Sequence, residues 1–122
     1  MDTRNKILTS ADSLSRPFTL VSGYFDVLRA EHVREFARVC DRTSIRPVVV
    51  VVLPCPEELL SQRARAELVA ALRMVDYVLT GDYEDLSRII ERLKPAHVVR
   101  LEDADQRRTG RLIEHVQRGQ TR

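Results

Sequence analysis

The side chains best suited to chemistry lie near the amino terminus, in residues 20–36, LVSGYFDVLRAEHVREF. A short apolar run leads through Gly23 into an amphipathic helical pattern, which is where α/β folds bind phosphates. Glycine lets backbone approach a ligand, and the first N–H groups of a helix are unpaired donors beside the positive end of its dipole. The pattern therefore predicts an anion- or phosphate-binding turn. The predicted turn comprises Ser22, Gly23, Tyr24, Phe25 and Asp26.

The elements that must position this turn alternate along the chain. The unbroken β-branched run at 48–53, VVVVVL, indicates a strand buried on both faces. Further strands are expected at 18–22, 75–80 and 96–101, and helices at 28–41, 56–74, 82–93 and 109–118. Alternation of strand and helix implies right-handed βαβ crossovers. We therefore expect an α/β fold, a Rossmann-like doubly wound parallel sheet of about four strands with helices on both faces.

The whole chain, residues 1–122, is expected to form a single domain in which residues 1–16 are a lead-in helix. Apolar periodicity sets the inward face of the helix predicted at 56–74. That face would carry Leu60, Ala64, Leu68, Ala71 or Leu72, and Val75. The outward face would carry Glu58, Arg63, Arg65, Glu67 and Arg73.

Three stretches resemble a known superfamily. GYFDVLRAEHV at 23–33 compares with the pattern GxFDxLHxGHV, RAELVAALRMVDYVL at 65–79 with a helix and its following strand, and RRTGRLIEHV at 107–116 with a late RTxGISTT segment. On these residues the chain resembles the HxGH-type nucleotidyltransferases, in particular glycerol-3-phosphate cytidylyltransferase and the nucleotidyltransferase domain of ADP-heptose synthase. The resemblance implies transfer of a nucleotidyl group from CTP or ATP to a phosphorylated acceptor, with Mg²⁺ arriving on the nucleotide.

The signature is degenerate in this chain. His32 matches the second histidine, whereas Arg29 replaces the first histidine and Glu31 replaces the glycine. By the resemblance, His32 and Arg29 would be the catalytic residues, and Thr109 would be the nucleotide-binding hydroxyl of the late segment. A carboxylate about 4 Å from a phosphate repels it by about 4 kcal/mol at an effective dielectric near 20. The helix N-terminus offsets only roughly 0.3 to 1 kcal/mol of that repulsion, so the changes predict impaired catalysis.

Two hypotheses follow, and fold alone does not separate them. The first is a cytidylyltransferase-like protein that is catalytically impaired and retains nucleotide or phosphate binding at the first strand–helix turn. The alternative is an active, atypical nucleotidyltransferase that transfers CMP or AMP to a phosphorylated sugar or polyol. Structural explanations are also open for several of these residues. Gly23 would be a required turn, Asp26 a helix cap, and His97 and His115 structural or exposed side chains.

Composition excludes several other classes. The net charge of +2 is too small to indicate a nucleic-acid or membrane partner, and no apolar run is long enough to span a bilayer. Cys40 and Cys55 lack CxxC spacing, so neither a metal site nor a disulfide framework is predicted, and a reducing cytoplasm fits best. The expected partner is a nucleotide or another phosphate-containing small molecule. A homodimer or a protein partner is also compatible with the sequence.

Overall fold

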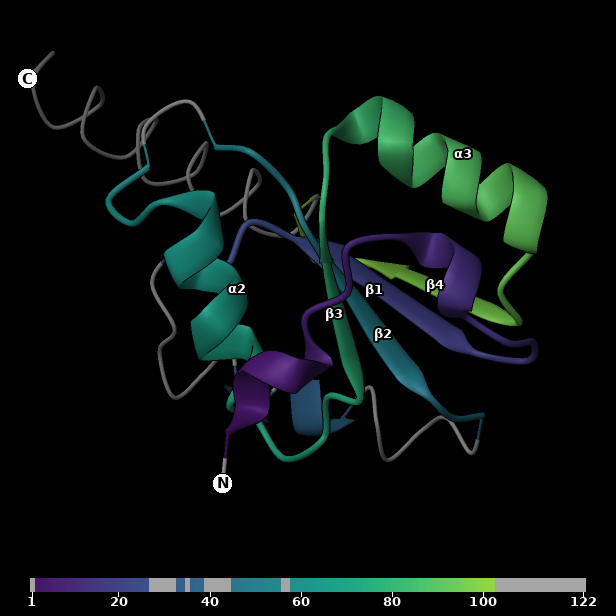
Figure 1. Cartoon of the computed structure of the whole chain (residues 1–122), viewed down its shortest axis with the longest axis horizontal. Coiled ribbons are helices and arrows are strands. Elements are labelled where there is room, and N and C mark those ends of the chain that lie inside the picture. Colours follow the sequence, from purple (N-terminus) through teal and green to yellow (C-terminus); the bar gives the residue numbers. More distant parts are fainter. Residues whose placement is uncertain (1, 27–32, 35, 39–44, 56–57, 103–122) are drawn as a thin grey trace, which may run out of the picture.

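A computed structural model describes residues 2–26, 33–34, 36–38, 45–55 and 58–102 (Figure 1). Within this part of the chain, four strands form one sheet in the order β3-β2-β1-β4, with every neighbouring pair parallel. The strands are β1 (Thr19–Gly23), β2 (Val48–Val52), β3 (Tyr77–Thr80) and β4 (His97–Arg100). The α/β, Rossmann-like architecture predicted from the sequence is confirmed, and each strand lies within the range expected for it to within two residues.

Two helices cover opposite faces of this sheet, α2 (Gln62–Ala70) and α3 (Tyr83–Leu93), as Figure 1 shows. Every residue of β1 and β2 is buried, so the valines of β2 point alternately to the two sides. Val48, Val50 and Val52 join the core on the α2 side, whereas Val49 and Val51 join the core on the α3 side. The unbroken valine run of the sequence is thus the central strand of a two-sided core.

The lead-in segment differs from the single helix expected there. It forms two short 3-10 helices, η1 (Thr3–Lys6) and η2 (Ala11–Ser13). Between them, Ile7 forms a parallel bridge with Val78, and the N–H of Leu8 donates to the Val78 carbonyl at 2.8 Å. A continuous helix would use these backbone groups internally, whereas here they cover the edge of β3.

The helix α2 also departs from expectation, both in length and in the face that it buries. It starts at Gln62, because the Ser61 hydroxyl accepts from the Ala64 N–H and caps the first turn. Its buried residues are Arg65, Ala66, Val69 and Ala70. Leu68, expected inside, is 43% exposed, and Arg65, expected in solvent, is fully buried.

The strand order places the candidate turn at a particular point of the sheet. From β1 the chain moves to β2 and β3 on one side, and β4 returns to the other side of β1. Open parallel sheets bind ligands outside the carboxyl ends of their strands at such a switch point. Ser22 of β1 pairs with Arg100 of β4 in this register, so the turn after β1 and the chain after β4 leave the sheet side by side. In the described part of the chain, helices long and apolar enough for a membrane span are absent.

Candidate functional site

Gly23 is tightly enclosed by its neighbours. A Cβ added to it would lie 2.9 Å from two ring atoms of Phe25 and 3.5 Å from Cβ of Leu101. The ring folds back because Phe25 has a positive φ of 54°, and it then packs on Phe36 with 5.2 Å between ring centroids. Phe25 is only 5% exposed, so its side chain belongs to the core. Close packing therefore accounts for the small residue at position 23.

A buried carboxyl group lies at the switch point. The hydroxyl of Ser22 donates to Glu102, at 2.8 Å from Oε2 and 3.0 Å from Oε1. Both side chains are buried, with Glu102 only 2% exposed. A buried carboxylate is retained where a hydrogen bond satisfies it. The chain just after β4 thus places an acidic group against the end of β1.

Asp26 binds backbone across the turn. Its carboxylate accepts from the N–H of Leu59 at 2.8 Å and from the N–H of Leu60 at 2.9 Å. Burial alone would raise the pKa of Asp26, but the two N–H donors and the nearby positive charge of Arg65 outweigh it and lower that pKa below its ordinary value. Asp26 therefore ties the turn after β1 to the segment that precedes α2.

Asp26→Asn is expected to destabilise the protein by about 1 to 2 kcal/mol near pH 7, because hydrogen bonds to an ionised acceptor are the stronger ones. A folded-state pKa below the unfolded value stabilises the protein above the unfolded pKa, near 4, and this contribution is lost as pH falls through the folded value. Urea unfolding of wild type and variant should thus converge below about pH 4. Asp12→Asn, on exposed η2, is the control. A wild-type advantage that grows on acidification would contradict the assignment.

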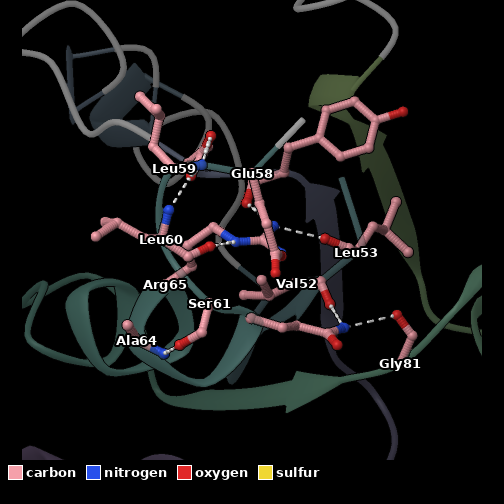
Figure 2. A network of polar contacts seen from close by, with 12 residues as sticks. Val52, Leu53, Glu58, Leu59, Leu60, Ser61, Ala64, Arg65 and Gly81 are labelled. Atoms are coloured by element: carbon pink, nitrogen blue, oxygen red, sulfur yellow. Dashed lines mark hydrogen bonds and ion pairs between the residues drawn. The ribbon is translucent and has the colours of Figure 1, made fainter. Parts of the chain in front are cut away.

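Arg65 is the centre of the network in Figure 2. Its Nη1 donates to the carbonyls of Tyr24 and Leu53, each at 2.7 Å, and its Nε donates to the Leu60 carbonyl at 3.1 Å. Nη2 donates to Oε2 of Glu58 at 2.9 Å. The guanidinium thus joins the chain after β1, the chain after β2 and the start of α2. The buried charge has a carboxylate partner and several carbonyl acceptors, which is what burial of an arginine requires.

Two further contacts hold the same edge. The amide of Gln62 donates to the carbonyls of Val52 at 2.9 Å and Gly81 at 3.1 Å, linking the ends of β2 and β3 (Figure 2). The hydroxyls of Tyr24 and Tyr83 are hydrogen-bonded, which connects the turn to the first residue of α3. The carboxyl edge of the sheet is therefore fixed by side chains of α2 and α3.

The structure describes some of the predicted site residues but not others. His32 and Arg29, with Glu31 beside them, lie outside the described residues, as does Thr109. Of the turn, the Ser22 hydroxyl, the Phe25 ring and the Asp26 carboxylate are each committed to protein partners. His97 is exposed on β4.

Three polar residues of this edge were not singled out as functional: Gln62, Arg65 and Glu102. One signal for Arg65 was available, because it begins one of the stretches that carry the resemblance. Groups of three or more His, Cys, Asp or Glu that could hold a metal ion do not occur among the described residues.

Comparisons with known proteins agree with this architecture. No protein-family model matches the chain. An FAD synthase of Ferroglobus placidus is 32% identical over 81 residues, which are 62% of this chain and 53% of that protein. The chain thus spans about half the length of that relative. A crystal structure of the lipopolysaccharide core biosynthesis protein of Thermoplasma volcanium superposes with a TM-score of 0.58 at 20% identity, covering 67% of this chain and 71% of that one.

The fold is nucleotidyltransferase-like. In this nucleotidyltransferase-like fold, the described edge consists of Gly23 and the turn after β1, the Ser22–Glu102 pair between β1 and β4, and the Arg65 network. The Ser22–Glu102 pair is a buried acidic group beside the end of β1.

Proposed function

We propose that this chain is a nucleotide-binding protein with a nucleotidyltransferase-like fold and impaired nucleotidyl transfer. The ligand would bind outside the carboxyl ends of β1 and β4, where doubly wound sheets take nucleotides. The observation that carries the proposal is the buried Glu102, hydrogen-bonded to Ser22 at this position. Nucleotidyl transfer requires cations and N–H donors around the developing phosphate charge, and a carboxylate has the opposite effect.

The acidic group also sets the class of nucleotide that fits. Two unit charges about 4 Å apart repel by about 4 kcal/mol at an effective dielectric near 20, so a triphosphate is disfavoured relative to a monophosphate. The positive charge of Arg65 offsets little of this repulsion, because the guanidinium is already paired with the Glu58 carboxylate at 2.9 Å. Glu31 would add a further negative charge in the resembling motif.

A series of ligands that differ in phosphate number tests this proposal. We expect CMP or AMP to raise the melting temperature at least as much as CTP or ATP at equal concentration, with Mg²⁺ present throughout. A ligand at one hundred times its Kd stabilises the native state by about 2.7 kcal/mol, which a thermal-shift measurement resolves. Affinity that rises tenfold or more from mono- to triphosphate would refute the proposal.

One alternative function has a specific observation in its favour. The 32% identity over 81 residues is to a protein named FAD synthase, which is compatible with an active, atypical nucleotidyltransferase that transfers CMP or AMP to a phosphorylated acceptor. In that case Arg29 and His32 would flank the phosphates of CTP or ATP, and Mg²⁺ would neutralise part of their charge. This alternative predicts release of pyrophosphate and tighter binding of triphosphates.

A further inference from the structure

A cavity of about 360 Å³ lies on the α3 side of the sheet. It is enclosed by the lead-in segment at 9–12, by the ends of β2 and β3, and by one face of α3. None of its lining residues belongs to the turn at 22–26. Its volume falls at the lower end of the range of small-molecule sites, about 300 to 1,000 Å³. The cavity is thus a candidate site separate from the nucleotide site proposed outside the carboxyl ends of β1 and β4.

The floor of this cavity is apolar. Val51 and Leu79 line it from the sheet, Ile89 and Leu93 from α3, and Ala11 from η2. Val51 is fully buried and Leu79 is 5% exposed, so the floor is continuous with the core on this side. Such a surface takes up the hydrocarbon or ring part of a ligand.

The rim on α3 carries two arginines one turn apart, Arg88 and Arg92. Arg88 lies 3.5 Å from Glu84 and 3.9 Å from Asp85, which balance part of its charge. For Arg92, no carboxylate of the described residues is within ion-pair distance. Arg16 does not line the cavity, but its Nη2 donates to the Arg92 carbonyl at 3.4 Å. The end of the cavity near the C-terminus of α3 is therefore positive.

Two acidic residues also line the cavity, and one of them is already satisfied. The Asp85 carboxylate accepts from the N–H of Asp82 at 3.0 Å in the capping box of α3, where the helix N-terminus further balances its charge. Asp12 is exposed on η2. The cavity thus combines an apolar floor with two charged groups that have no ion-pair partner among the described residues, Arg92 on α3 and Asp12 on η2.

We propose that this cavity binds a small organic anion, with its apolar body against Leu79, Ile89 and Leu93 and its anionic group at Arg92. Guanidinium groups bind carboxylate, sulfonate and phosphate alike, and the apolar floor distinguishes an organic anion from an inorganic one. This site is different from the nucleotide site proposed outside the carboxyl ends of β1 and β4, and the proposal does not depend on that site.

Fluorescence titration of the full chain with 1-anilinonaphthalene-8-sulfonate tests this site, with neutral N-phenyl-1-naphthylamine as the matched uncharged probe. Arg92→Gln is expected to weaken the sulfonate by about three- to tenfold, the scale of one lost charge-assisted contact, and to leave the neutral probe unchanged. Ala11→Leu, which puts a larger side chain into the cavity, should weaken both probes. Arg63→Gln, an exposed arginine on α2, is the control and should change neither.

Amide chemical shifts locate the probe in the same samples. Thr80, Gly81 and Arg92 should shift on addition of the sulfonate, whereas Gly23 should not. Absence of saturable binding to the wild type, equal affinity in Arg92→Gln and Arg63→Gln, or shifts centred on residues 22–26 would each overturn the proposal. Melting temperatures of all variants within a few degrees of the wild type establish that the probe reports on the folded protein.

Discussion

Arg65→Met is expected to lower the free energy of unfolding by about 3 to 5 kcal/mol, because three backbone carbonyls lose the donor that satisfies them. Methionine fills much of the volume, but it offers no donor to the carbonyls of Tyr24, Leu53 and Leu60. Each buried acceptor left without a partner costs about 1 to 3 kcal/mol. The loss of Glu58 as a partner adds little, because its side chain is 44% exposed.

Urea unfolding at pH 7 measures this loss, with Arg63→Met as the matched control. Arg63 lies on the same helix but is 62% exposed, and it forms a 3.4 Å pair with Glu67, so its removal should cost less than about 0.5 kcal/mol. The stability loss of Arg65→Lys should lie between those of the two methionine variants. A single ammonium group cannot reach all the carbonyls that the planar guanidinium contacts. Equal stability of Arg65→Met and Arg63→Met would refute the network as a source of stability.

Glu102→Gln is expected to raise the affinity for CTP or ATP about tenfold or more, equal to about 1.4 kcal/mol, and to change the affinity for CMP or AMP by less than about threefold. The amide carbonyl still accepts from the Ser22 hydroxyl, so the fold at the end of β4 is retained. Only the negative charge at the switch point is removed. Coulomb repulsion at close range exceeds this gain even after partial screening by salt.

Isothermal titration calorimetry measures both affinities, and Glu91→Gln is the control, because it removes the same charge from the exposed face of α3. The control should leave every nucleotide affinity unchanged. An unchanged triphosphate affinity in Glu102→Gln would mean that the carboxylate does not face the ligand. Repulsion by Glu102 would then not explain impaired transfer.

The sheet could be predicted from the sequence because each strand is marked by a local pattern of residues. The run at 48–53 could only be a strand with two buried faces, and the Gly81 and Pro95 boundaries delimit its neighbours. The helix α3 also matched expectation, since Asp82 is followed three residues later by Asp85, which completes a capping box.

The buried polar contacts of the site could not be predicted from the sequence, because they join residues far apart in the chain. A helical pattern alone assigns Arg65 to solvent, and only the carbonyls at the ends of β1 and β2 explain why it is buried instead. Glu102 follows a strand that shows no motif, and its partner Ser22 lies 80 residues earlier in the chain. The prediction of which face of α2 is buried was wrong for the same reason. Leu68 and Val69 are both apolar, and tertiary contacts decide which of them is buried.

Pyrophosphate release measures whether nucleotidyl transfer is impaired in this chain. The full chain would be incubated with CTP or ATP, Mg²⁺ and a set of sugar and polyol phosphates. We expect no release above the protein-free blank with the wild type. Sustained turnover that His32→Ala abolishes would contradict the claim and establish an active nucleotidyltransferase.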